Sequence, residues 1–455
     1  MQHNAYTEKP VQNVDLIIHA TWMIPIIPRD TVLQNQAIVV DNGNIIDICN
    51  QGESTLRYQT KELITLDEYV VLPGLINTQA HGAMSLVTTN NSTAKTSLEQ
   101  HLWPIEQTWC DEAFIHDGLQ LAMAKMLSSG TTYFSDMYFF PKVAASAVHE
   151  VGMRAQISFP ILDASNAWAS DADDHISKGL SLYDHYGAHP LINIAFGPYS
   201  ASSVSDQTLN KIATYTNELQ ANLQIRLHET VAEIQQSMAL SGKRPSQRLA
   251  DFGLLTPHTQ CLNMAHIDDG DIALLQLGGS HVVVCPSANT KYQHSAQRLI
   301  DADINACIST GDGTTSKNLD ILNEVQLATL LNKPACDDGS TVSAGRKNAI
   351  TSLEMATING ARALGREETL GSIEVGKQAD LCAIALDGLN HIPQHDPINT
   401  LTSNTSGLKA SHVWVKGRCL LQNHQLTTID ERKLRQRVQY WQQLLSPTSP
   451  SVITK

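Results

Sequence analysis

Val70-Val71-Leu72-Pro73-Gly74-Leu75-Ile76-Asn77-Thr78-Gln79-Ala80-His81-Gly82-Ala83-Met84 is the stretch of sequence that decides the fold. Its apolar, β-branched beginning predicts a buried strand, and the polar residues and glycine near its end predict a turn. Gln79 and His81 are therefore expected where this strand ends. A histidine there is a candidate for chemistry, although a lone histidine is more often an ordinary hydrogen-bonded residue.

Short apolar segments alternate with helix-length segments after this run. Strands are expected at residues 131–134, 155–159, 191–196, 223–227, 261–264, 282–285 and 306–309. This alternation predicts an α/β fold, a (β/α)8 TIM barrel, whose active site lies at the carboxyl ends of its strands. Residues 70–330 provide about the ~250 residues that such a barrel needs.

Both chain ends are rich in predicted strands, and we expect them to pair in a small β-sandwich. An Asn42-Gly43 hairpin turn joins two of the strands near the N-terminus, because these residues adopt positive φ angles readily. Helical periodicity returns from Glu431 to Leu445. The predicted domains are residues 1–69 and 366–425 for the two parts of the sandwich, 70–365 for the barrel, and 426–455 for a C-terminal helix and tail.

Composition and charge limit the possible partners. The 455 residues are 42% hydrophobic and 17% charged, with a net charge of −14, which argues against nucleic acid or an anionic membrane as the main partner. The beginning of the chain has no signal-peptide pattern. The scattered cysteines favour reduced thiols and a cytoplasmic location; they are Cys49, Cys110, Cys261, Cys285, Cys307, Cys336, Cys382 and Cys419.

Several motifs resemble the amidohydrolase superfamily, and in particular its methylthioadenosine/S-adenosylhomocysteine deaminase-like branch, often labelled triazine-hydrolase-like. The motifs cover nearly the whole chain. They are Pro73-Gly74-Leu75-Ile76-Asn77, Phe134-Ser135-Asp136-Met137-Tyr138, Leu227-His228-Glu229-Thr230, residues 351–365 and residues 371–381. The resemblance implies a deaminase-type hydrolase of non-peptide C–N bonds, a homodimer, and one Zn²⁺ or Fe²⁺ ion that makes hydroxide available at neutral pH.

The resemblance also implies a set of metal ligands, and this chain departs from it. The branch uses His-x-His on strand one, but the first histidine is replaced by Gln79 and only His81 remains. It uses a histidine on strand five, three residues before a proton-shuttling glutamate; here Glu229 is present, but the ligand position is Arg226. A glutamine oxygen is a weak donor for a divalent ion, and a guanidinium is permanently charged.

Three further positions differ or stay open. The strand-six histidine that handles metal-bound water is replaced by Asn263, and a substrate-contacting histidine after strand four is replaced by Tyr199. On strand eight, matching by residue type makes Asp312 the ligand, whereas counting back without a gap makes it Gly311. We therefore expect Gln79, His81, Tyr199, Arg226 and Asn263 to line the pocket, with Glu229 and Asp312 as candidate catalytic residues.

Arg226 is the substitution that bears most directly on metal binding. At ~4 Å from a divalent ion and an effective dielectric constant of ~20, its charge would oppose binding by about 8 kcal/mol. We expect no metal, with His81 and Asp312 as the residual candidate ligands, and we expect Arg226 to replace the ion and pair with Glu229 or Asp312. Removing Arg226 would then cost ~3–5 kcal/mol of stability. In the alternative, Arg226 points to solvent.

Two functional hypotheses follow. The preferred one is an inactive or repurposed paralogue of a metal-dependent aminopurine-nucleoside deaminase, which retains a site for a small molecule, an aminopurine nucleoside by resemblance. The other is an active C–N hydrolase with a rearranged centre built from His81, Glu229 and Asp312, with His228 or His266 as a further ligand. Metal content distinguishes the two hypotheses.

Overall fold

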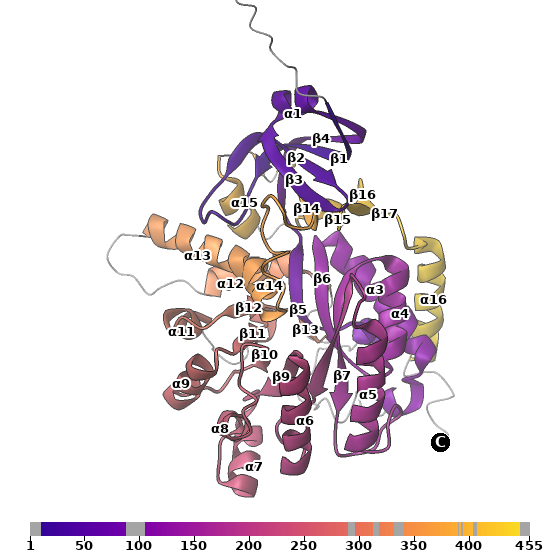
Figure 1. Ribbon diagram of the computed structural model, residues 1–455, viewed down its shortest axis with the longest axis vertical. Coiled ribbons are helices and arrows are strands. Elements are labelled where there is room, and N and C mark those ends of the chain that lie inside the picture. Colours follow the sequence, from indigo (N-terminus) through magenta and orange to yellow (C-terminus); the bar gives the residue numbers. More distant parts are fainter. Residues whose placement is uncertain are drawn as a thin grey trace, which may run out of the picture.

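A computed structural model describes residues 11–87, 105–289, 296–312, 318–331, 341–389, 391–392, 395–403 and 407–445. It contains a barrel and a smaller domain formed by the two ends of the chain (Figure 1). The eighth cysteine, Cys336, lies outside the described residues, and the other seven are free thiols, six of them buried. No helix in the described ranges is long and apolar enough to span a membrane.

The barrel is a parallel sheet in which neighbouring strands follow the order of the sequence, which confirms the predicted (β/α)8 fold. Its last strand has two short parts, β12 and β13, and β13 pairs with β5 to bring the first and last strands together. The strands are β5 (Leu75–His81), β6 (Thr131–Met137), β7 (Arg154–Ile161), β8 (Ile192–Pro198), β9 (Leu223–Leu227), β10 (Thr259–Asn263), β11 (His281–Val284), β12 (Ala306–Ile308) and β13 (Gly311–Asp312).

Helices follow the barrel strands and cover their outer faces (Figure 1). They are η1 (Gly82–Leu86), α3 (Glu112–Ser128), α4 (Pro141–Val151), α5 (Ala172–Tyr186), α6 (Asp206–Leu219), α7 (Val231–Ser241), α8 (Pro245–Asp251), α9 (Asp269–Gly278), α10 (Pro286–Asn289), α11 (Ala296–Asp301), α12 (Ile321–Leu331), α13 (Thr341–Met355) and α14 (Ile358–Ala363). Several helices begin at a capping side chain, such as Asp111 before α3 and Thr230 before α7, as expected for these residue types.

The smaller domain is an eight-stranded sheet in the order β17-β16-β15-β14-β4-β1-β2-β3. Residues from both chain ends share one apolar core, which includes Ile18, Ile38, Leu381 and Trp414. The elements are β1 (Gln12–Met23), β2 (Leu33–Asp41), β3 (Asn44–Asn50), α1 (Gln51–Arg57), β4 (Tyr58–Pro73), β14 (Leu381–Ala385), α15 (Pro397–Ser403), β15 (Ala410–Val415), β16 (Arg418–Gln422) and β17 (Gln425–Leu426).

The stretch 70–84 contains the end of one strand and the whole of another, where the sequence suggested a single strand. Val70–Pro73 completes β4 in the small domain, and Leu75–His81 forms β5 of the barrel. Gly74 lies at the crossing, where an added Cβ would come within 2.1 Å of Thr132 Oγ1. Only glycine therefore allows the chain to pass so close to β6 at this point.

A buried ion pair joins the barrel to the small domain. Arg154, at the start of β7, donates from Nε and Nη2 to the two carboxylate oxygens of Asp380, each at 3.0 Å. Both side chains are at most 5% exposed. Asp380 also accepts the backbone N–H of Lys416 at 2.8 Å, so the carboxylate ties together β7 and the turn after β15.

The C-terminal helix α16 (Glu431–Leu444), which the periodicity of the sequence predicted, lies along α3 (Figure 1). Trp441 Nε1 and Arg437 Nε donate to Asp117 Oδ2 at 2.7 and 2.8 Å. Burial alone would raise the pKa of Asp117, but hydrogen bonds from His116, Arg437 and Trp441 outweigh it and lower this pKa to about 2.

Candidate functional site

The predicted site residues come from the carboxyl ends of different barrel strands. Gln79 and His81 end β5, Arg226 lies in β9 with Glu229 just after it, and Asn263 ends β10. Because all the strands are parallel, these ends meet at one rim of the barrel. Tyr199 directly follows β8, and Ser200 forms a bridge with Arg226. The strand order thus brings residues that are up to 184 positions apart, as Gln79 and Asn263 are, to one rim.

Arg226 contacts the single histidine that remains on β5. Its Nη2 atom lies 3.0 Å from His81 Nε2, and both side chains are buried, at 8% and 4% exposure. A guanidinium nitrogen only donates hydrogen bonds, so Nε2 must be the acceptor and must carry no proton in this contact. The lone pair of His81 Nε2 is therefore engaged by Arg226. The alternative prediction, in which Arg226 points to solvent, is therefore wrong.

Tyr199 and Glu229 complete the immediate surroundings of the guanidinium. Arg226 Cζ lies 4.9 Å from the centre of the Tyr199 ring, a cation–π distance, and Nη1 lies 3.4 Å from the Tyr199 hydroxyl. Arg226 Nη1 and Glu229 Oε2 form an ion pair at 3.7 Å. The expected pairing with Glu229 is thus present, but the N–O distance exceeds that of a hydrogen bond. The shorter contact of the guanidinium is the one with His81.

Glu106 is a residue of this site that the sequence argument missed. It accepts a hydrogen bond from the Tyr138 hydroxyl at 2.6 Å, and the Tyr138 ring meets His81 edge-on at a centroid distance of 6.1 Å. Burial raises the pKa of Glu106, while the Tyr138 hydrogen bond and the charge of Arg226 oppose this rise. Glu106 directly follows Trp103-Pro104-Ile105, but no sequence pattern places that segment at the barrel rim.

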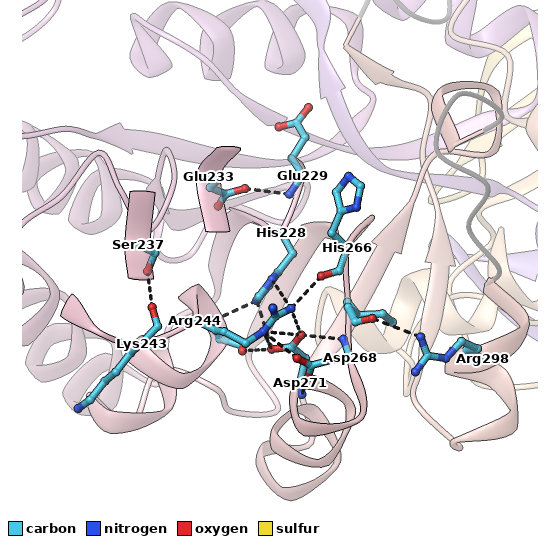
Figure 2. Close-up of polar contacts among 12 residues, drawn as sticks. His228, Glu229, Glu233, Ser237, Lys243, Arg244, His266, Asp268, Asp271 and Arg298 are labelled. Carbon is cyan, nitrogen blue, oxygen red and sulfur yellow. Dashed lines mark hydrogen bonds and ion pairs between the residues drawn. The ribbon is translucent and has the colours of Figure 1, made fainter. Parts of the chain in front are cut away.

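His228 belongs to a different cluster, beneath the rim. Figure 2 shows its ring directed toward Arg244 and Asp271, while the Glu229 side chain extends the opposite way. The Ser246 backbone N–H donates to His228 Nε2 at 3.1 Å, and Arg244 Nε donates to Asp271 at 3.1 Å. Burial lowers the pKa of His228 to about 4. The suggestion that His228 supplies a metal ligand at the rim is therefore wrong.

The position of Glu229 is fixed through its backbone. Its N–H donates to Glu233 Oε2 at 2.8 Å, as Figure 2 shows. Thr230 caps α7 by accepting the N–H of Glu233 at 3.1 Å, so both residues hold the turn between β9 and α7. Burial raises the pKa of Glu233 to about 7. The other residue considered as a ligand, His266, has its side chain directed away from the His228 cluster in Figure 2.

The remaining predicted site residues lie at the ends of β5, β10 and β13. Gln79 is buried, and its Oε1 atom has no hydrogen-bond partner among the described residues. Asn263 is half-buried and adopts a left-handed φ of 74°, which asparagine tolerates better than most residues. Gly311 pairs with Ala80 and Asp312 pairs with His81 in the β13–β5 ladder. The side chain of Asp312 lies outside the described residues.

As the structure places them, the described donors at the rim do not form a site for a divalent cation. In the part of the chain that the structure describes, no three His, Cys, Asp or Glu side chains are grouped as metal ligands. At the rim, the imidazole lone pair that would bind a metal already accepts from Arg226. The guanidinium adds a positive charge beside it, so a Zn²⁺ or Fe²⁺ ion bound by His81 and Glu229 would have to displace Arg226 from its position in the structure.

The chain is similar to proteins of known family over most of its length. The profile of the amidohydrolase family matches residues 70–420. A 5-methylthioadenosine/S-adenosylhomocysteine deaminase from Teredinibacter turnerae is 40% identical over 95% of this chain and 98% of its own. A protein of the same description from Saccharophagus degradans is 42% identical over 94% of this chain and 96% of its own.

Two solved structures have a fold similar to that of this chain. The zinc-bound structure of an adenosine deaminase from Xanthomonas campestris matches with a TM-score of 0.90 and 31% identity, covering 96% of this chain and 99% of that one. Atrazine chlorohydrolase from Arthrobacter aurescens, complexed with zinc, has a TM-score of 0.83 at 19% identity, covering 94% and 99%. The second similarity concerns the fold alone.

Proposed function

Because this chain belongs to the amidohydrolase family, we propose that it is a paralogue of metal-dependent aminopurine-nucleoside deaminases that has lost ordinary metal-hydroxide chemistry. The observation that carries this proposal is the 3.0 Å contact between Arg226 Nη2 and His81 Nε2. In the deaminase branch that the motifs resemble, the corresponding histidines bind the metal ion. The family resemblance therefore leads us to expect Zn²⁺, whereas the described residues of this chain do not form a site for it.

In this proposal Arg226 takes over the electrostatic role of the ion. Burying a carboxylate without a counter-charge is costly, and Arg226 provides that charge for the partly buried Glu229 and, at longer range, for Glu106. Tyr199 supports the guanidinium from its aromatic face. The rim then serves as a binding site for a small molecule of nucleoside size. Homodimeric assembly and a cytoplasmic location belong to the same proposal.

Retention of Glu229 favours one alternative, an active C–N hydrolase with a rearranged centre. Glu229 is held by Glu233, and one third of its side chain is exposed, so a carboxylate capable of proton transfer is available at the rim. This alternative needs another way to activate water, which the described residues do not offer. We therefore keep it as the second candidate.

Ammonia release tests the proposal. The purified protein should show no turnover, or very slow turnover, of methylthioadenosine, S-adenosylhomocysteine or adenosine when Zn²⁺ or Fe²⁺ is supplied. Glu229→Gln is the matched control, because it keeps the side-chain shape and removes the proton-transferring carboxylate. Turnover at ordinary enzymic rates that Glu229→Gln abolishes would establish the alternative instead.

A further inference from the structure

A hollow lies between helices α4 and α5 and the loop that precedes α5 (Figure 1). Its volume is about 380 Å³, within the ~300–1,000 Å³ range of sites that hold small molecules. Pro141 and Leu182, both buried, and the half-buried Trp168 provide its apolar lining. Lys142 and Lys178 line it as well, so apolar and cationic groups share one hollow. Its described lining does not include any residue of the rim site.

The loop around Trp168 holds this residue in place. The Trp168 N–H donates to Asn166 Oδ1 at 2.8 Å, and the Trp168 carbonyl accepts from Lys178 Nζ at 2.7 Å. The ring of His175 packs against the indole in a T-shaped arrangement, with centroids 5.4 Å apart. Asn166 Nδ2 in turn lies 2.7 Å from His175 Nε2. Because the indole is fixed before a ligand arrives, a ligand ring can pack on it at little cost in side-chain freedom.

Positive charge exceeds negative charge among the groups at the hollow. The Lys142 side chain is exposed, and its ammonium forms no ion pair with a described residue. Lys178 pairs with Asp174 Oδ2 at 2.9 Å, and Asp174 also accepts the Ser170 N–H at 3.0 Å. Two lysines against one aspartate leave a surplus of one positive charge, although the net charge of the chain is −14. His185 lines the same hollow and would add positive charge only on protonation.

An apolar hollow with one surplus positive charge matches a flat apolar ligand that carries a single negative charge. A phosphate monoester, which is close to a dianion at neutral pH, would leave unbalanced negative charge beside Asp174. A carboxylate carries one charge, and its two oxygens can accept from two ammonium groups. We propose that the hollow binds a planar aromatic carboxylate. The ring of this ligand packs against Trp168 and Leu182. Its carboxylate faces Lys142 and the N–H of Lys178 that neither Trp168 nor Asp174 accepts.

Isothermal titration calorimetry of the full chain with 2-naphthoate tests the proposal. Two comparison probes each remove one feature of this ligand: 2-naphthamide keeps the ring without the charge, and cyclohexanecarboxylate keeps the charge without the aromatic ring. We expect each of them to bind at least about threefold more weakly than 2-naphthoate. Added salt should weaken the binding of 2-naphthoate but not that of 2-naphthamide, because only the first contact is electrostatic.

Variants locate the binding at this hollow. Lys142→Glu reverses an exposed charge and should weaken 2-naphthoate binding about tenfold, equivalent to about 1.4 kcal/mol. Lys61→Glu is the matched control, because Lys61 is also exposed but lies on β4 in the small domain, and this variant should bind like the parent. Trp168→Leu should abolish the difference between 2-naphthoate and cyclohexanecarboxylate, whereas Trp168→Phe should keep it. Melting curves check that both Trp168 variants fold.

Several results would overturn the inference. Equal binding of 2-naphthoate and 2-naphthamide would show that the lysines do not recognise a carboxylate. Unchanged affinity in Lys142→Glu would place the bound 2-naphthoate elsewhere, for example at Arg226, and an equal loss in Lys61→Glu would indicate an effect of net charge alone. The absence of saturable binding would refute the site outright. None of these results bears on metal content or ammonia release, which test the proposed function separately.

Discussion

Replacing Arg226 by alanine should lower the free energy of unfolding by about 2–4 kcal/mol. Removal of a partner from a fully buried ion pair costs ~3–5 kcal/mol, but the pair with Glu229 is 3.7 Å long and Glu229 is partly exposed, so its share is smaller. The hydrogen bond to buried His81 contributes about 1–3 kcal/mol, and the cation–π contact with Tyr199 adds about 0.5–2 kcal/mol. These contributions overlap, because one side chain makes them all.

Urea unfolding followed by circular dichroism measures this change, with the midpoint and slope compared between variant and parent. Arg298→Ala is the matched control. Arg298 also pairs with a carboxylate, Asp269, at 2.7 Å, but the arginine is 47% exposed and the aspartate 98% exposed. That substitution should cost no more than about 1 kcal/mol. Equal stabilities of Arg226→Ala and the parent protein would show that the guanidinium does not replace a buried cation.

Other substitutions test the wider structure. Asp136→Asn should make the stability of the fold less dependent on pH, because burial raises the pKa of Asp136 to about 7 and an amide that still accepts the Gly82 N–H does not titrate. In the parent protein the stabilisation by protonated Asp136 is complete below pH ~4 and is lost as the pH rises through 7. Thermal melts at pH 5 and pH 8 measure this, and an equal pH dependence in variant and parent would contradict it. Asp380→Asn should destabilise the fold by ~3–5 kcal/mol, because it leaves buried Arg154 without its counter-charge, and a denaturant midpoint within error of the parent would refute this. Asp117→Asn should lower the free energy of unfolding by roughly 2 kcal/mol at neutral pH, because the stabilisation by ionised Asp117 is present above pH ~4 and is lost as the pH falls through about 2. A melting temperature at pH 7 equal to that of the parent would show that the contact of Asp117 with α16 does not stabilise the fold.

The fold could be predicted from the sequence because its signals are local and repeated. Apolar strands alternate with helix-length segments, and the run at residues 70–84 was predicted as a buried strand, although it contains the end of β4 and the whole of β5. The exact position of the domain crossing could not be predicted in the same way. It depends on the close approach of Gly74 to Thr132, two residues whose contact no periodicity encodes.

The site could be predicted only as far as its residues lie on strands. The strand pattern placed Gln79, His81 and Arg226 at one rim, because parallel strands end there together. It gave no signal for Glu106, which reaches the rim through a hydrogen bond from Tyr138. It also could not show that His228 points away from the rim, since that orientation depends on contacts with Arg244, just before α8, and with Asp271 in α9.

The metal content of the purified protein tests the central claim most directly. Protein prepared without chelator and dialysed should contain well under one equivalent of Zn, Fe or Mn per chain by elemental analysis. Arg226→His alone should not change this, because Gln79 remains, whereas a Gln79→His/Arg226→His/Asn263→His variant should gain metal. Stoichiometric metal that survives dialysis of the parent protein would contradict the claim that Arg226 has taken the place of the ion.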